Sequence, residues 1–309
     1  MIENKIKNRY CCVIVTYNRA PDLTVINRAM DSRLVDGLII SDNSNDPYII
    51  KGIRNQFDSR FQDKYVIIEN HENLGISRAM SIAMKKGLEL GFEFAFLLDD
   101  DAQLSDDYFE LMLDTMEKYK RDDKKIAAVC PTLSNNPKHL SKIIKRRKTD
   151  IIKQCITSGM LIDIMIAVSL GGYSEKYFLE YADIEFTNRL YNSGYKILRY
   201  NKVMIYQQLG KNIESIASRV LYFPMYCINI LKFNLNLGNN IMYFMPLYDP
   251  NRTINIDKAR VKFMKQITRS KIRLLYHPIT LLYKHTVLYF LTGNQQYLKI
   301  SFRYIYEVK

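Results

Sequence analysis

Short apolar runs alternate with stretches of helical spacing over the first 130 residues. Residues 73–91 (NLGISRAMSIAMKKGLELG) carry apolar side chains at helical spacing, and Gly91 supplies a stop. The apolar runs lie at 10–17 (YCCVIVTY), 37–47 (GLIISDNSNDP), 64–70 (KYVIIEN), 92–101 (FEFAFLLDDD) and 126–133 (IAAVCPTL). Strands that alternate with helices predict an α/β fold, in which a mostly parallel sheet is flanked by helices.

Polar side chains gather where the first four predicted strands end. In chain order they are Thr16, Asn18 and Arg19, then Asp42 and Asn43, then Asn70 and Asn73, and finally Asp99, Asp100 and Asp101. In open parallel sheets ligands bind outside the carboxyl ends of the strands. The convergence of these polar groups therefore predicts a ligand site at this edge of the sheet.

The three consecutive acids after the fourth strand repel one another unless a positive charge lies beside them. A pair such as Asp99 and Asp101 suits Mg²⁺ or Mn²⁺, because hard cations prefer carboxylate oxygens and leave positions open for diphosphate oxygens. The alternative interpretation is an acidic surface turn. Asp106 and Asp107 need no such explanation, since we expect them in the first turn of a helix at 106–120 that Ser105 caps.

A second group of acids follows a Gly-Gly turn in GGYSEKYFLEYADIEF, where Glu180, Asp183 and Glu185 lie close together. A carboxylate at Asp183 can act as a general base toward an attacking hydroxyl. The alternative is that these acids only begin a helix, where negative side chains are favourable. The two interpretations are compatible, because a helix start can fix a catalytic carboxylate.

Composition adds limits on size and compartment. The 309 residues are 48% hydrophobic, which is enough for one large core or two smaller ones. The five cysteines form no CxxC pair and no metal-ligand spacing with the four histidines, so we expect a reduced, cytosolic protein. The N-terminus lacks a signal-peptide pattern, and no run of about 18 uncharged apolar residues occurs, so we expect neither secretion by that route nor a membrane span.

The net charge of +13 is placed unevenly. Residues 1–210 carry 30 basic and 28 acidic side chains (net +2), whereas residues 211–309 carry 15 basic and 4 acidic ones (net +11). The predicted domains are accordingly a catalytic domain at 1–210, with a nucleotide-binding half (1–130) and an acceptor or sugar half (131–210), and a basic, aromatic-rich helical region at 211–309.

The basic region has two interpretations. Its helices, ESIASRVLYFPMYCINILKF and RSKIRLLYHPITLLYKHTVLYFL, suit an anionic membrane surface, where each basic residue contributes roughly 1 kcal/mol. Alternatively, the apolar stripe packs on the catalytic domain or on a second copy in a homodimer. No nucleic-acid recognition motif accompanies the charge, so we expect no nucleic-acid partner.

Six segments together resemble the inverting glycosyltransferases of family 2, with the bacterial rhamnosyl- and galactofuranosyltransferase branch most similar. They are CVIVTYNR, LIISDNSNDP, ENLGISRAMSIAMKKG, FLLDDDA, TSGMLI and GGYSEKYFLEYADIEFTNRLYNSGYKI, in the family's order and spacing over roughly residues 10–210. The resemblance implies a GT-A fold, which is Rossmann-like, together with a sugar-nucleotide donor, a divalent metal and single-displacement inversion at the anomeric carbon.

The resemblance also implies roles for individual residues. Asp183 would be the catalytic base, Asp99 and Asp101 would hold Mg²⁺ or Mn²⁺, and Asp42 would bind the pyrimidine ring. The donor-binding set would be Thr16, Asn18, Arg19, Asp42, Asn73, Arg78, Asp99, Asp100, Ser158 and Gly159. Within it Asp100 has no defined role. Arg189 also matches a recurring position, where it would contact substrate or form a structural ion pair.

Two departures from the family pattern matter. Many relatives carry a metal-site histidine before an xLG segment, whereas this chain has YQQLG, with Gln207 or Gln208 at that place. The QxxRW signature of processive synthases is absent, as is any tryptophan, which favours the addition of one or a few sugars.

The expected function is transfer of a single sugar from dTDP-rhamnose, UDP-galactofuranose or a UDP-hexose. The acceptor would be a lipid-linked or oligosaccharide intermediate of a cell-surface polysaccharide, at the inner face of the plasma membrane. The alternatives are a sugar-nucleotide pyrophosphorylase, whose glycine-rich loop is missing from TYNRAPDL, and a non-catalytic membrane- or RNA-binding scaffold of the same fold.

Overall fold

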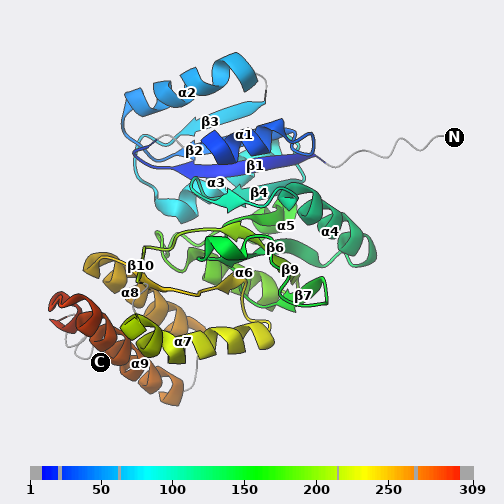
Figure 1. Ribbon diagram of the computed structural model, residues 1–309. Coiled ribbons are helices and arrows are strands. Elements are labelled where there is room, and N and C mark those ends of the chain that lie inside the picture. The colour runs from blue at the N-terminus through cyan, green and yellow to red at the C-terminus, as the bar shows by residue number, and fades with distance from the viewer. Residues whose placement is uncertain (1–8, 20–22, 62–63, 214–215, 268–270, 300–309) are drawn as a thin grey trace. The chain divides into compact units, whose positions relative to one another are not determined.

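The computed structural model describes residues 9–19, 23–61, 64–213, 216–267 and 271–299. It contains two compact units (Figure 1), of which unit 1 comprises residues 1–207 and 232–241, and unit 2 comprises residues 208–231 and 242–309.

Unit 1 is an α/β unit built on one mixed sheet. Its helices are α1 (Leu23–Asp31), α2 (Pro47–Phe61), α3 (Gly75–Glu89), α4 (Tyr108–Asp122), α5 (Ile164–Ser169) and α6 (Ala182–Asn192), with a 3-10 turn at Pro137–His139. Its strands are β1 (Tyr10–Thr16), β2 (Gly37–Asp42), β3 (Tyr65–Glu69), β4 (Phe94–Leu98), β5 (Gln103–Leu104), β6 (Ile126–Ser134), β7 (Thr149–Ile152), β8 (Met160–Asp163), β9 (Lys196–Tyr206) and β11 (Asn240–Ile241).

The strand order explains why polar loops meet at one edge. The sheet runs β3-β2-β1-β4-β8-β6-β9-β5, with β1 to β4 mutually parallel and β8 antiparallel to both of its neighbours. Thr16 pairs with Asp42, and Ile14 pairs with Leu98, in register. The segments after β1, β2 and β4 therefore leave the sheet at the same edge, as the sequence predicts, and the α/β fold class is confirmed.

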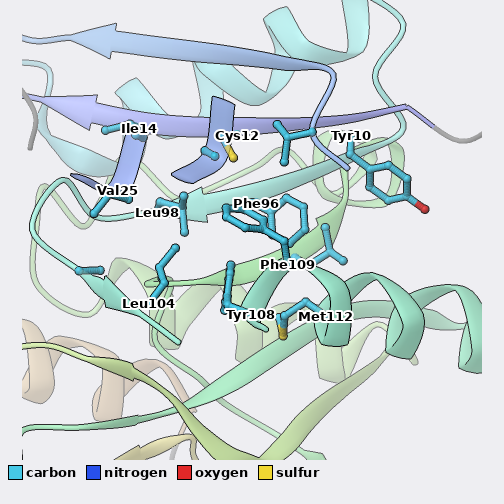
Figure 2. Close-up of a cluster of buried hydrophobic side chains, with 14 of the residues drawn as sticks. Tyr10, Cys12, Ile14, Val25, Phe96, Leu98, Leu104, Tyr108, Phe109 and Met112 are labelled. Carbon is cyan, nitrogen blue, oxygen red and sulfur yellow. The ribbon is translucent and has the colours of Figure 1, made fainter. Parts of the chain in front are cut away.

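Alternate side chains of the central strands enter two apolar layers, because successive residues of a strand face opposite sides. One layer packs α1, α2 and α4 against the sheet. Figure 2 shows part of it, with Tyr10, Cys12 and Ile14 of β1 and Phe96 and Leu98 of β4 near Tyr108, Phe109 and Met112 of α4. The other face meets α3, where an added Cβ at Gly87 would contact Cys11, Ile39 and Ile164.

A buried charge cluster joins β7, β9 and the segment 236–241 of unit 1. Arg199 is fully buried on β9, and its guanidinium lies 2.8 Å from Asp150 Oδ2, which also accepts a hydrogen bond from Lys145 at 2.8 Å. The same guanidinium donates to Asn201 and to the carbonyl of Gly238. Removing one partner of such a cluster would leave an unpaired charge in the interior, which costs free energy. The contacts therefore hold the 236–241 segment on the sheet.

One local prediction is wrong. The helix expected at 106–120 begins at Tyr108, and Ser105 does not cap it, because the Ser105 hydroxyl donates to Asp107 Oδ1 at 2.9 Å instead. Asp107 also accepts a hydrogen bond from Lys202, 95 residues away, while Asp106 pairs with Arg28. The helix itself is confirmed, with Asp107 at its N-cap position, and both acids in addition form ion pairs with distant residues.

Unit 2 is mainly helical. It contains most of α7 (Ile216–Asn234), then α8 (Pro250–Ile267) and α9 (Lys271–Thr292), with a two-stranded antiparallel sheet of β10 (Lys211–Ile213) and β12 (Met245–Leu247). The C-terminal helical region is confirmed. Asp257 and His285 form a buried pair at 2.7 Å that joins α8 to α9, and Lys284 donates to the same carboxylate at 2.9 Å. Among the described residues, no helix is long and apolar enough to cross a membrane.

Candidate active site

The ends of β1 and β2 are joined by a network around Asp42. This carboxylate is fully buried and accepts hydrogen bonds from the Thr16 hydroxyl (2.6 Å) and from the backbone N–H and hydroxyl of Ser44 (2.9 and 3.0 Å). The Ser44 hydroxyl accepts in turn from the backbone N–H of Asn18 at 2.7 Å. The network brings three of the predicted donor-binding residues together and fixes the loop after β1.

The N-terminus of α3 adjoins this network. Asn43 donates to the carbonyl of Gly75 at 3.2 Å, and the side chain of Asn73 accepts from the Gly75 N–H at 3.0 Å. Gly75 has a φ of +74°, and an added Cβ would collide with Phe178, whose carbonyl accepts from the Ile76 N–H. This turn therefore requires glycine, and it holds the segment that leads to Asp183 against α3.

The three acids after β4 have partners on two sides. Arg19 makes a two-pronged ion pair with Asp100, at 2.6 and 2.7 Å, and lies 3.9 Å from Asp101. From the other side, Gln207 Nε2 donates to Asp99 Oδ2 at 2.6 Å and to Asp101 Oδ1 at 3.3 Å. The repulsion between the acids is thus offset by a guanidinium and an amide, and Asp100 acquires a defined partner.

Ser158 lies beside Asp99 and two residues before the start of β8. Its side chain is 2% exposed, and within the described part of the chain its hydroxyl has no hydrogen bond of good geometry. Burial raises the pKa of Asp99, the hydrogen bond from Gln207 and the neighbouring hydroxyl of Ser158 oppose that rise, and the charge of Asp101 adds to it. A buried hydroxyl without a well-formed partner next to a desolvated carboxyl marks a place prepared for a polar ligand.

Gly159, the next residue, allows close packing against neighbouring strands. Its φ is +75°, and a Cβ there would collide with Ile205 and Pro131. The carbonyl of Gly159 accepts a hydrogen bond from the buried Tyr108 hydroxyl at 2.7 Å. Glycine is therefore required by the backbone, and this requirement holds whether or not a sugar contacts the residue.

Asp183 is the second residue of α6, which begins at Ala182. The preceding Tyr181 has a φ of +66° and turns the chain sharply into the helix. Burial raises the pKa of Asp183 to about 7. The backbone N–H of Ile184, 2.8 Å away, offsets part of this rise, whereas the negative charges of Asp99 and Glu180 add to it. A carboxyl with a pKa near the operating pH is well suited to act as a general base.

Two of the arginines differ in role. Arg189 donates to both oxygens of Glu185 and to the carbonyls of Leu170 and Gly172, so its guanidinium is used within the fold. Of the two roles considered from sequence, the structural ion pair is the one present. Arg78 is exposed on α3 and lies 3.8 Å from Glu175, outside the contacts around Asp99 and Asp42.

The donor set suits a hard cation even though it is small. No group of three or more His, Cys, Asp or Glu side chains that could bind a metal occurs in the described ranges. Two carboxylates, Asp99 and Asp101, nevertheless converge on one amide, and the Ser158 hydroxyl adjoins them. Carboxylate, amide and hydroxyl oxygens are ligands that Mg²⁺ and Mn²⁺ accept, with further positions left for phosphate or water.

Comparison with known families assigns the chain. Residues 11–169, which is more than half of it, match the model of "Glycosyl transferase family 2". The chain belongs to glycosyl transferase family 2. The matched region includes β1 to β4 and the Asp99–Asp101 segment, and the membership confirms both the family and the enzyme class that the motifs predict.

Individual relatives are more distant. The chain is 23% identical over 198 residues to the dTDP-rhamnosyl transferase RfbF of Shigella flexneri; the match covers 59% of this chain and 63% of that protein, less than two thirds of its length. Among solved structures, GalNAc-T7 with UDP, GalNAc and Mn²⁺ aligns with a TM-score of 0.51 and 13% identity, covering 72% of this chain and 49% of that one. S. aureus TarS 1-349 in complex with UDP-GlcNAc aligns with a TM-score of 0.50 and 12% identity, covering 91% and 81%. These likenesses support the GT-A fold of this family 2 member.

Gln207 and the Arg19–Asp100 pair are the site contacts that sequence reasoning did not assign. Position alone did not distinguish Gln207 from Gln208, but the structure does: Gln207 is 9% exposed and faces the aspartates, whereas Gln208 is exposed. Alternation along the end of β9 was the signal that could have distinguished them.

Proposed function

We propose that this family 2 member transfers one sugar, with inversion, from a nucleotide-diphosphate donor to a hydroxyl acceptor. The donor would be dTDP-rhamnose, UDP-galactofuranose or a UDP-hexose, and the acceptor a lipid-linked or oligosaccharide intermediate of a cell-envelope polysaccharide. One observation carries the proposal: a carboxyl with a pKa of about 7, Asp183, is close enough to Asp99 for their charges to interact. The proposed base in α6 would therefore lie near the proposed cation site.

The donor would bind across the ends of β1, β2 and β4. Asp42 accepts three hydrogen bonds, all within its own loop network, and a carboxylate has about four lone-pair sites. One acceptor site therefore remains on Asp42, but the carboxylate is fully buried, so it would reach the imide N–H of uracil or thymine only after its surroundings rearrange. Arg19, whose side chain is 59% exposed, would turn toward the diphosphate, since guanidinium groups bind phosphate oxygens in the same two-pronged manner as carboxylates.

Mg²⁺ or Mn²⁺ would be held by Asp99 and Asp101. When bound, such a cation stabilises the negative charge that develops on a diphosphate leaving group. The side chains that remain, Gln207 and Ser158, would orient these carboxylates and exclude water from them.

Asp183 would act on the acceptor. In its ionised form the carboxylate takes the proton of the acceptor hydroxyl while that oxygen forms a bond to the anomeric carbon. The bond between the anomeric carbon and the diphosphate oxygen breaks in the same displacement, and the nucleoside diphosphate leaves with the electron pair. A single displacement of this kind inverts the configuration at the anomeric carbon.

Unit 2 would bring the enzyme to its acceptor. The exposed face of α8 carries Lys258, Lys262 and Lys265 at helical spacing, and the acid of this helix, Asp257, is buried in its pair with His285. A basic face of this kind is attracted to anionic headgroups at the inner face of the plasma membrane. Dimerisation through α7 to α9 is the competing use of this region.

A donor screen tests the proposal. The purified chain is heated with UDP-, dTDP- and GDP-sugars in the presence of Mn²⁺, and its melting temperature is recorded. We expect UDP or dTDP compounds to raise the melting temperature, and Asp101→Ala to abolish the Mn²⁺-dependent part of the rise. Stabilisation by none of the nucleotide sugars, in a sample that unfolds cooperatively, would reject the proposed donor class.

A further inference from the structure

Gln207 contacts both of the carboxylates, Asp99 and Asp101, that would hold a cation. Its backbone N–H donates to the Ser134 carbonyl at 3.2 Å, so the side chain extends from a fixed point at the end of β9. Its amide nitrogen is 2.6 Å from Asp99 Oδ2 and 3.3 Å from Asp101 Oδ1. The side chain thus joins the two acids through hydrogen bonds from one –NH₂ group.

This orientation of the amide is incompatible with a cation between the acids. A cation there would face the partly positive N–H groups of Gln207. Rotation of the amide about its last side-chain bond would instead present Oε1, which is a suitable ligand for a hard cation. With Oε1 facing Asp99 and no cation present, however, two acceptor oxygens would oppose each other. The amide therefore has one favourable orientation without the cation and the opposite one with it.

We propose that Gln207 is a positioning residue that makes cation binding depend on the donor diphosphate. In the nucleotide-free protein its –NH₂ group competes with the cation for Asp99 and Asp101. With a diphosphate bound, Gln207 would present Oε1 instead of its amide hydrogens to a cation that Asp99 and Asp101 would hold. The inference rests on the proposed function and deepens it, because it specifies how the cation and the donor depend on each other.

Ser158 supports the inference independently. Its hydroxyl is buried and has no hydrogen-bond partner among the described residues. A polar group left in this condition beside the carboxylates is expected to gain its partner from a ligand. A polar ligand bound beside Asp99 would supply that partner.

Thermodynamic linkage gives the inference a measurable form. If the diphosphate raises the affinity for the cation by some factor, the cation raises the affinity for the diphosphate by the same factor. We expect a factor of about 10 to 100 for UDP, within the range usual for coupled sites. UMP, which lacks the second phosphate, should produce little coupling.

The experiment measures Mn²⁺ binding rather than turnover. Free Mn²⁺ is followed by electron paramagnetic resonance during titration of the full chain, alone and with saturating UDP or UMP. The variants are Gln207→His, which offers a nitrogen lone pair in place of the amide, Gln207→Leu, which offers neither donor nor ligand, and the neighbouring control Gln208→His. Circular dichroism and thermal unfolding verify that each variant is folded.

We expect Gln207→His to bind Mn²⁺ about tenfold more tightly without nucleotide, and to lose most of the UDP coupling. Gln207→Leu should weaken Mn²⁺ binding in the presence of UDP about tenfold, and Gln208→His should match the wild type. Wild-type coupling in both Gln207 variants, or equal Mn²⁺ affinity of the wild type with and without UDP, would overturn the inference.

Failure of the proposed function would look different. If neither UDP nor dTDP binds to any variant, the proposed donor is wrong. The nucleotide-free comparison of the wild type with Gln207→Leu, which removes the amide hydrogens and adds no ligand, still decides whether the amide competes with the cation: tighter Mn²⁺ binding by the variant supports the competition, and equal or weaker binding overturns it. If Gln207→Leu does not fold, Gln207→Met makes the same comparison.

Discussion

Replacing Asp183 with Asn should separate catalysis from stability. The substitution keeps the size of the side chain but removes the carboxylate that would accept the acceptor proton. Loss of a general base costs about 10²- to 10⁴-fold in rate, so we expect kcat to fall by that amount. Donor affinity should change little, since the groups proposed to bind the nucleotide lie at the ends of β1, β2 and β4.

The same substitution should stabilise the protein at neutral pH. The pKa of Asp183 is about 7 in the folded chain, against 3.8 for an ordinary aspartate, and a difference of about 3 corresponds to about 4 kcal/mol. Because the folded state holds this proton more tightly, the wild type loses stability as the pH rises from about 4 to about 7. The side chain is partly accessible, and solvent screening reduces the loss to roughly 2–4 kcal/mol.

Urea denaturation in EDTA from pH 4 to pH 8 checks this. Asp183→Asn should match the wild type near pH 4 and exceed its unfolding free energy by roughly 2–4 kcal/mol above pH 7. As a control, Glu180→Gln keeps the base but removes a charge that raises its pKa, so the rising limb of the activity profile should move to lower pH. Full activity of Asp183→Asn, or equal stability of the two proteins at every pH, would refute the reasoning.

Three further predictions concern other parts of the chain. Arg19→Ala should weaken UDP binding about 10- to 100-fold and leave UMP binding unchanged in calorimetry; equal losses for both would contradict a diphosphate contact. Arg199→Ala should lower the unfolding free energy by about 3–5 kcal/mol, and an unchanged urea midpoint would contradict the buried cluster. Replacing Lys258, Lys262 and Lys265 with Gln should weaken sedimentation with anionic vesicles by about 100-fold, whereas unchanged binding would favour dimerisation.

The sequence predicts the site's edge well because each apolar run ends abruptly at a polar residue. Thr16, Asp42 and Asp99 are placed together by strand register alone, since parallel strands with matched ends deliver the following residues to one edge. The local pattern is sufficient here because the runs of apolar residues that form the strands can be read directly from neighbouring positions in the sequence.

Contacts between residues far apart in the sequence could not be predicted from the local apolar and polar pattern. Asp107 accepts from Lys202 rather than lying in a capped first turn, and Arg199 is buried on a strand by partners at Asp150 and Gly238. Such contacts form only after the strands are ordered in the sheet, and no residue spacing in the sequence predicts them. For Gln207 the YQQLG segment indicates the place, but the choice over Gln208 and the contacts with two acids 106 and 108 residues away come only from the structure.

The most direct test of the account is transfer itself. The nucleotide sugar chosen by the thermal screen, labelled in its sugar, is incubated with the enzyme, Mn²⁺ and a bacterial lipid extract, and the anomeric configuration of the labelled product is determined by NMR. The account predicts one sugar added with inverted configuration by the wild type and a loss of at least about 100-fold in Asp183→Asn. Retained configuration, or equal transfer by the two proteins, would contradict it.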